Sequence, residues 1–383
     1  MAARKALSGR GFSSRAGGSR ATFTPMNARW AMAAMSLLLV TSIAGADAPP
    51  RKHKPSRTRR PAASASRRAR ARAAPRRPPR PPAPPSLVLP VSAGSRDLEV
   101  GEACRRGLEG VNGGAIAMDP RTGRVLAVVN PGLTVENAYQ PCSVFKIVVA
   151  IAGLSERAIT PDTVYNCNGG CWMWPGHGPV DLRRALANSC NPYFEWVGER
   201  VGWPTVQRYG QMLGLGAPSG INMAEEAPGR LPLFVPPSQV GHVSSHAAGV
   251  STSAVQLGVL LSAALNGGVV FQPQVSGAQD FVPRPRWRLP PQTVTTGLTD
   301  GFLGAVNEGS AATAFDPDIQ VAGKTGTCAG LGWFASYAPA DAPELVVIVF
   351  VRPGSGHLAS TVGGRIFQYL YKTPGRTTIS AGG

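Results

Sequence analysis

The sequence predicts an α+β fold, in which a mostly antiparallel sheet is flanked by helices and accompanied by a helical subdomain. Strand-like runs lie near both ends of the region beyond residue 98, and periodic apolar helices lie between them. The first two of these runs are separated by a short turn, which is typical of a β-hairpin. Because the strands come from both ends of the region, we expect the helices to cover the sheet.

The elements follow from local patterns in chain order. β-rich runs at 114–119 and 124–129 are joined by the turn Pro120-Arg-Thr-Gly123. Residues 143–154 are apolar on nearly all sides and predict a buried helix. The remaining expected elements are a helix over 181–201, a helix that follows the Ser251-Thr252 cap and runs to Leu265, strands at 319–328, 332–337 and 345–351, and a last helix near 364–371.

The positive charge is confined to the N-terminal part of the chain. The protein has 383 residues and a formal net charge of +18, and residues 1–90 hold 19 of its 39 Lys and Arg residues but a single acidic residue, Asp47. Residues 91–383 are therefore electrically neutral. This distribution argues against a basic globular domain that binds nucleic acid, so we expect no nucleic-acid partner.

Residues 1–46 have the layout of a secretory signal peptide or of a single N-terminal membrane anchor. Basic residues precede an uncharged run of 17 residues at 30–46, which ends in the cleavage-like pattern Ala44-Gly45-Ala46. Since such a run is also at the short end of what spans a bilayer, both alternatives stay open, and both export the rest of the chain. We expect a protein of the cell envelope, anchored on the outer side of the cytoplasmic membrane or free as a periplasmic or secreted protein.

Residues 47–97 are rich in Arg and Pro and poor in apolar side chains, which predicts a basic, disordered tether. The charge of this tether suits an anionic lipid surface or an anionic wall polymer. The globular domain is expected over residues 98–375, followed by a flexible tail at 376–383.

Ser143 and Lys146 form an S-x-x-K tetrad at the start of the apolar helix. Their spacing places the serine hydroxyl and the lysine amine on one face of the helix, one turn apart. A lysine among apolar neighbours has its charged form disfavoured, so it can accept the serine proton near neutral pH. Taken alone, such a tetrad is more often a lysine that extends from a core helix to solvent.

Two further motifs accompany this tetrad. Ser189-Cys190-Asn191 lies 46 residues after Ser143, and Lys324-Thr325-Gly326-Thr327 lies 135 residues after Ser189. The second motif falls on a predicted strand, where Gly326 would let a substrate backbone approach closely. Together, in this order, they are the S-x-x-K, S-x-N and K-T-G set of penicillin-recognising serine enzymes.

On these motifs the region from about Leu98 to Lys372 resembles the transpeptidase domain of penicillin-binding proteins, which has the serine β-lactamase and D,D-peptidase fold. Flanking segments at 119–127, 220–232, 252–257 and 333–339 are similar as well. The resemblance implies acyl transfer on the D-Ala-D-Ala ends of peptidoglycan stem peptides. Ser143 would attack the penultimate D-Ala carbonyl and form an acyl-enzyme, and Lys146 would take the serine proton.

The resemblance also implies roles for the other motif residues. Ser189 would relay a proton to the leaving amine with the assistance of Lys324, and Asn191 would bind the substrate amide. Residues 325–327 would bind the substrate, since Thr325 and Thr327 would hold its terminal carboxylate across Gly326. β-Lactams are expected to acylate Ser143 as inhibitors, other wall-synthesis proteins are candidate partners, and no cofactor is implied.

Three alternatives stay open beside the transpeptidase. A serine β-lactamase shares the three motifs, although the Glu-x-x-Leu-Asn motif of one deacylating type is absent from the sequence. A D,D-carboxypeptidase differs only in that water replaces the acceptor amine. The third alternative is a non-catalytic β-lactam sensor or scaffold module. The presence of every catalytic residue argues against this alternative.

The cysteines suggest one disulfide. Cys167 and Cys171 are close in sequence, and an exported location permits them to pair. His177 nearby could indicate zinc instead, but a fourth ligand is not apparent, so the disulfide is favoured and no metal is predicted. We expect three cysteines to be small packing residues beside the catalytic motifs, namely Cys142, Cys190 and Cys328. We expect the histidines of this region to lie in loops or on the surface, namely His177, His242, His246 and His357.

Overall fold

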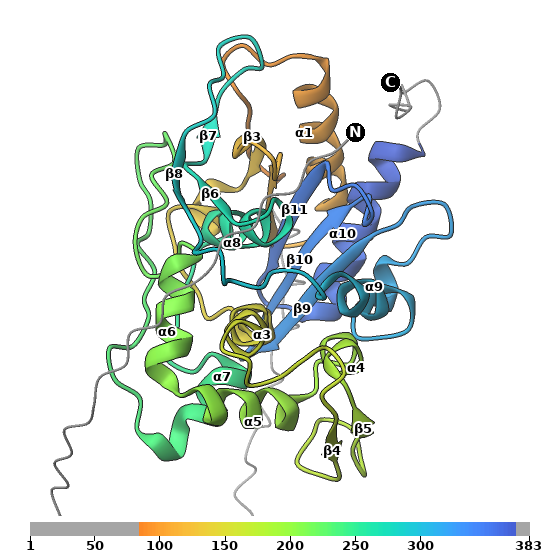
Figure 1. Ribbon diagram of the computed structural model, residues 1–383. Coiled ribbons are helices and arrows are strands. Elements are labelled where there is room, and N and C mark those ends of the chain that lie inside the picture. The colour runs from red at the N-terminus through yellow and green to blue at the C-terminus, as the bar shows by residue number, and fades with distance from the viewer. Residues whose placement is uncertain (1–83, 373–383) are drawn as a thin grey trace, which may run out of the picture. The chain divides into compact units, whose positions relative to one another are not determined.

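The computed structural model describes residues 84–372 of the chain (Figure 1). Within this range a seven-stranded sheet has the strand order β1-β3-β2-β11-β10-β9, and β7 pairs with β3 beside that path. Every pair along the path is antiparallel, whereas β7 is parallel to β3. The predicted α+β fold with a mostly antiparallel sheet is confirmed.

The strands of the main sheet come from both ends of the described region, as the sequence predicted. Their bounds are β1 (Leu87–Val88), β2 (Gly113–Met118), β3 (Arg124–Val129), β7 (Gln274–Val275), β9 (Ala322–Cys328), β10 (Leu331–Ala338) and β11 (Leu345–Val351). Two small two-stranded sheets are formed by β4 (Tyr165–Cys167) with β5 (Gly178–Val180) and by β6 (Val269–Phe271) with β8 (Pro285–Arg288).

Helices cover both faces of the sheet and extend beyond one of its ends (Figure 1). Helices α1 (Ser95–Gly107) and α10 (Gly356–Tyr371) pack on one face, and α8 (Ala254–Leu265) packs on the other. Helices α3 (Lys146–Ser155), α5 (Asn191–Val201), α6 (Trp203–Met212) and α7 (Val240–His246) gather into the helical subdomain that the sequence predicted. The remaining helices of the described residues are α2 (Pro131–Thr134), α4 (Leu182–Ala187) and α9 (Thr299–Asn307), and 3₁₀ turns lie at Cys142–Phe145, Pro237–Gln239 and Ala312–Ala314.

Strand β11 shows why the sheet is apolar on both faces. Val346, Ile348 and Phe350 point into the core that contains α3 and α8. The alternate residues 345, 347, 349 and 351 point into the core beside α1 and α10. Because side chains alternate between faces, a strand buried on both sides is a continuous apolar run.

Three helices differ from the sequence prediction, and the first of them, predicted over 143–154, begins at Lys146. The helix predicted over 181–201 is broken into α4 and α5, because Ser189 has a left-handed backbone conformation (φ 53°) and Pro192 lies in the first turn of α5. The last helix begins at Gly356, eight residues earlier than predicted. Its glycines, such as Gly364, permit close packing rather than ending the helix, since a Cβ there would lie 2.9 Å from the backbone of Ala314.

The domain boundary predicted at residue 98 is too late. Residues 84–97 include β1 and the first residues of α1, so this part of the predicted tether is folded. The predicted signal or anchor at 1–46, the rest of the tether and the tail at 376–383 lie outside the described residues. Within residues 84–372 none of the helices is long and apolar enough to cross a membrane.

We predict that Asp97→Asn lowers the free energy of unfolding by about 3 kcal/mol, because it leaves a partly buried guanidinium without its carboxylate. Arg124 Nη1 lies 2.7 Å from Asp97 Oδ1, and the two side chains are 13% and 1% exposed. Urea unfolding of the purified chain measures the effect. Glu308→Gln is the control, since it breaks an exposed pair with Arg183 and should cost less than about 1 kcal/mol. Equal losses in the two variants would contradict the prediction.

Candidate active site

Ser143 lies in a 3₁₀ turn, Cys142–Phe145, that directly precedes α3. The sequence predicted it inside the helix, whereas the helix begins at Lys146. The turn is fixed against the sheet from two sides, because Trp333 Nε1 donates to Gln140 O at 2.8 Å and a disulfide joins Cys142 to Cys328. The nucleophile candidate is therefore anchored to strands β9 and β10 before α3 begins.

The disulfide differs from the one that the sequence suggested. Cys142 and Cys328 are 186 residues apart, and each adjoins a catalytic motif. The pairing predicted for Cys167 and Cys171 is wrong, since both thiols are free in the structure. The prediction that Cys142 and Cys328 only fill space is wrong as well.

Lys146 is buried, and its Nζ atom points into the turn formed by residues 189–191, called the S-C-N turn below. Nζ donates to Ser189 O at 2.8 Å, to Ser189 Oγ at 3.2 Å and to Asn191 Oδ1 at 2.6 Å. Burial lowers the pKa of Lys146 to about 7, although the nearby thiols of Cys190 and Cys171 and the Glu195 carboxylate oppose this shift. The ammonium form can donate all three of these bonds. The neutral form, which a pKa of about 7 makes available near physiological pH, donates two and keeps a lone pair for a proton, as the sequence predicted for a base.

The K-T-G motif lies on β9, beside the turn that carries Ser143. Burial and repulsion from Lys146 both hold the pKa of Lys324 well below its usual range, and its Nζ donates to Thr325 O at 3.0 Å. Gly326 was expected to make room for a substrate backbone. In the structure the backbone of Pro141, and not a substrate, packs closely against Gly326, since a Cβ on Gly326 would lie 2.7 Å from Pro141 O.

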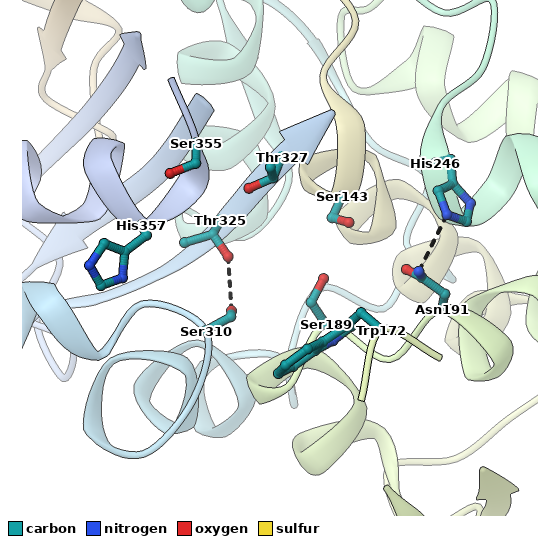
Figure 2. Close-up of a pocket in the computed structure, with 10 residues that line it drawn as sticks. All are labelled: Ser143, Trp172, Ser189, Asn191, His246, Ser310, Thr325, Thr327, Ser355 and His357. Carbon is teal, nitrogen blue, oxygen red and sulfur yellow. Dashed lines mark hydrogen bonds between the residues drawn. The ribbon is translucent and has the colours of Figure 1, made fainter. Parts of the chain in front are cut away.

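These motifs surround one cavity of about 510 Å³ (Figure 2). In the close-up, Ser143, Ser189 and Asn191 lie on one side of the cavity, and Thr325 and Thr327 lie on the other. Five of the lining residues were not assigned to the site from the sequence: Trp172, Ser310 and Ser355 were not singled out, and His246 and His357 were expected in loops or on the surface. Two members of the predicted set, Lys146 and Lys324, are buried behind the wall.

His246 orients the amide of Asn191. Because Asn191 Oδ1 accepts from Lys146, its Nδ2 faces His246 Nε2 at 3.3 Å and donates to it. The ring proton then lies on Nδ1, which donates to Ser245 Oγ, and that hydroxyl donates to Glu195 Oε1 at 3.0 Å. Burial lowers the pKa of His246, and His242 and Lys146 act in the same direction, so the neutral ring can accept at Nε2. The sequence placed His246 in a loop or on the surface because its partners lie on another helix.

Two groups of side chains in the described part of the chain have ligand atoms close enough for a metal ion. One consists of Glu195, His242 and His246, of which Glu195 and His246 already serve the Asn191 network. The other consists of Cys167, Cys171, Cys190 and His177. Cys190 belongs to the S-C-N turn, so this second group adjoins the cavity.

The fold and the three motifs that meet at a buried lysine define a penicillin-recognising serine domain. The chain belongs to the family described as penicillin binding protein transpeptidase domain, which matches residues 113–372. Among curated relatives, stage V sporulation protein D of Bacillus subtilis (strain 168) is 28% identical over 297 residues, which cover 63% of this chain and 45% of that protein. Peptidoglycan D,D-transpeptidase MrdA of Haemophilus influenzae is 26% identical over 332 residues, which cover 65% of this chain and 51% of that protein.

The chain spans about half the length of these two curated relatives. Among solved structures, the apo transpeptidase domain of Burkholderia pseudomallei penicillin-binding protein 3 has a TM-score of 0.64 at 21% identity. That match covers 73% of this chain and 95% of the solved chain, which bears out the fold.

We predict that His246→Ala weakens substrate capture by about tenfold, because Asn191 loses the hydrogen bond that orients its amide. The effect should fall on KM for a donor peptide and on the second-order rate of penicillin acylation, with little change in kcat. His246→Gln should recover part of the loss, since its carbonyl oxygen can accept from Asn191.

His242→Ala is the matched control for this experiment. His242 stacks on His246 with ring centroids 4.4 Å apart but is exposed, and His246 Nε2 is the ring nitrogen that faces Asn191. If His242→Ala and His246→Ala changed KM equally, His246 would have a packing role and not a positioning one.

Proposed function

We propose that the chain is a serine-type peptidoglycan D,D-transpeptidase that acts on D-Ala-D-Ala stem peptides through an acyl-enzyme at Ser143. One observation carries the proposal: the buried amine of Lys146 lies one turn from Ser143 and binds the S-C-N turn, at the wall of a cavity that Thr325 and Thr327 complete. A nucleophile, a base with a lowered pKa and a polar binding wall are what acyl transfer requires.

Acylation begins when Ser143 Oγ bonds to the carbonyl carbon of the penultimate D-Ala. The serine proton passes to the neutral amine of Lys146, whose burial makes it available as a base near neutral pH. The backbone N–H groups of Ser143 and Thr327 are the donors proposed for the developing oxyanion.

The tetrahedral intermediate then loses the terminal D-Ala. The C–N bond breaks, the leaving amine takes a proton from Ser189 Oγ, and Lys146 returns that proton to Ser189 across their 3.2 Å hydrogen bond. We assign Lys324 to assist this transfer, because it is buried close enough to Lys146 for the charge of Lys146 to lower its pKa. An acceptor amine next attacks the Ser143 ester, forms the cross-linking amide and gives a proton back to Ser143.

The hydroxyl-rich side of the cavity suits the terminal carboxylate of the donor. Thr325 and Thr327 face the cavity there, Ser310 and Ser355 lie beside them, and His357 lies next to Thr325 (Figure 2). Thr325 Oγ1 donates to Ser310 Oγ at 2.8 Å, and it would turn this proton to the carboxylate when the donor peptide binds. Several short hydroxyl donors can bind one carboxylate without a buried opposite charge.

The relatives support this reading. MrdA of Haemophilus influenzae is named a peptidoglycan D,D-transpeptidase, and the structure of penicillin-binding protein A from M. tuberculosis is an imipenem acyl-enzyme complex. Another solved structure with the same fold belongs to a peptidoglycan synthase complex. We therefore propose peptidoglycan as substrate, β-lactams as inhibitors and wall-synthesis proteins as partners.

The cellular location follows from the same proposal. A peptidoglycan enzyme works in the cell envelope, and residues 1–46 would export it as a cleaved signal or hold it as an anchor. The basic segment that follows would contact anionic lipid or wall polymer, while the neutral folded domain reaches its substrate.

We predict that fluorescent penicillin labels the purified chain covalently and that Ser143→Ala lowers acylation by at least about 10³-fold, because the variant has no nucleophile. Ser95→Ala, an exposed serine at the start of α1, should label like the wild type. With a donor peptide and a D-amino acid acceptor, the wild type should release D-Ala and form the new amide.

Other products would point to the alternatives. Rapid release of the label over many turnovers would make the protein a β-lactamase, and hydrolysis with no amide product would make it a carboxypeptidase. Full wall-synthesis activity of Ser143→Ala in cells would make it a non-catalytic module. Each of these results would overturn the transpeptidase proposal.

We also predict a pH profile set by Lys146. Since the base works when deprotonated, the acylation rate should rise about tenfold per pH unit below its pKa of about 7 and become constant above it. Stopped-flow labelling between about pH 5 and pH 9 measures the profile. His246→Gln should keep its shape, whereas Lys146→Arg should abolish acylation. A rate that does not change with pH would contradict the role of Lys146 as base.

A further inference from the structure

Three cysteines and a histidine form a cluster directly beside the S-C-N turn. The ligand atoms of Cys167, Cys171, His177 and Cys190 all lie within 4.8 Å of one another. His177 Nδ1 lies 3.3 Å from Cys171 Sγ and 3.7 Å from Cys167 Sγ. These four residues are called the Cys/His cluster below.

The Cys/His cluster has a complete ligand set for a tetrahedral Zn²⁺ ion. Zn–S bonds of about 2.3 Å and Zn–N bonds of about 2.0 Å place neighbouring ligand atoms about 3.5 to 3.8 Å apart. The sulfur–nitrogen distances of 3.3 and 3.7 Å are close to that spacing, so small side-chain shifts would seat one ion. Three thiolates and an imidazole fill all four positions, which is the pattern of a closed structural site.

The loop between β4 and β5 is shaped to bring three of these ligands together. Cys167 ends β4, Cys171 lies in the loop, and His177 directly precedes β5. A Cβ on Gly176 would overlap the carbonyl of Cys167, so the chain folds back closely on itself at this glycine. Four glycines in and beside this loop have positive φ angles, which are 119° at Gly169, 66° at Gly170, 128° at Gly176 and 65° at Gly178.

The tip of this loop has little apolar packing, although the strands on either side of it contact the core. Strands β4 and β5 pair over three residues in a sheet of their own, and Trp172 and Trp174 in the loop are 61% and 89% exposed. A two-stranded hairpin of this size is marginally stable by itself. A metal ion would supply the cross-link that such a small element lacks.

A disulfide accounts for the Cys/His cluster less well than a metal ion. A disulfide would join two of the three sulfur atoms. The third sulfur and the imidazole would then lie beside the disulfide without a function. The structure leaves all three thiols free and forms its disulfide between Cys142 and Cys328. The convergence of four ligand atoms, rather than of two, favours the ion.

We propose that the Cys/His cluster binds one Zn²⁺ ion and that this ion fixes the S-C-N turn and one wall of the active-site cavity. Cys190 lies between Ser189 and Asn191, so a bond to its sulfur holds both neighbours, including the left-handed Ser189. Trp172 directly follows the ligand Cys171, lines the cavity and donates from Nε1 to Asn188 O at 2.9 Å. The effect on catalysis rests on the proposed transpeptidase function, whereas zinc binding does not.

Metal content of the full chain tests the proposal directly. The wild type, purified without chelators, should contain about one zinc per chain by elemental analysis. Cys171→Ser and His177→Ala should lose that zinc, and Cys104→Ser, which changes a buried cysteine on α1, should keep it. Co²⁺ added to the chelator-treated wild type should give the absorption bands of a tetrahedral thiolate complex.

Two results would overturn the proposal. One is a reduced wild-type chain that holds no zinc as purified and takes up neither Zn²⁺ nor Co²⁺. The other is a native disulfide between any two cysteines of the Cys/His cluster, found by mass spectrometry of the unreduced chain. If Cys171→Ser or His177→Ala fails to fold, the chelator-treated wild type still decides, since its melting temperature should fall and recover with Zn²⁺ but not with Mg²⁺.

The consequence for the active site has a separate measurement. Removal of zinc from the wild type should slow penicillin acylation about tenfold or more, and added Zn²⁺ should restore it. Ser143→Ala should bind zinc like the wild type, so a failure of the transpeptidase proposal would leave zinc binding intact. Acylation that is unchanged in a chain shown to be free of zinc would overturn the link between the ion and the S-C-N turn.

Discussion

The burial of Lys146 is the constraint on which the rest of the active site depends. An amine removed from water needs hydrogen-bond acceptors, and Lys146 finds three oxygen atoms in the S-C-N turn. A main-chain carbonyl and two side-chain oxygens can meet at one nitrogen only if the chain stops being helical after α4. The left-handed Ser189 and the new helix that begins at Asn191 provide this break. Backbone strain at Ser189 is therefore a requirement of the buried base.

The nucleophile is held by a different set of contacts. The turn with Ser143 is joined to β9 by the disulfide at Cys142. The backbone before this turn packs directly against Gly326, where no side chain intervenes, and accepts a hydrogen bond from Trp333 of β10. The sheet thus positions the nucleophile, and the helical subdomain positions the partners of the base. Lys146 belongs to both, because it begins the helix that directly follows the nucleophile turn.

What the sequence could predict depended on how local each signal was. Strand β11 matched its prediction residue for residue, because an apolar run of that length needs no knowledge of its neighbours. The three motifs were recognisable for the same reason, and the structure places them around one cavity. The break at Ser189 was missed because helical periodicity continues across it. The partners of Cys142 and of His246 lie on distant elements, so packing decides those contacts and no local pattern records them.

The S-C-N turn concentrates these demands in three successive residues. Ser189 faces the base, Cys190 belongs to the Cys/His cluster, and Asn191 faces both Lys146 and His246. Three residues have only six soft backbone torsions, so fixing the direction of one side chain restricts the other two. A change at one partner would therefore displace the whole turn, and acyl transfer is sensitive to displacements of about 1 Å. Substitutions around this turn can leave the fold intact and still disable the site, because a displacement too small to unfold the domain already moves the catalytic side chains out of position.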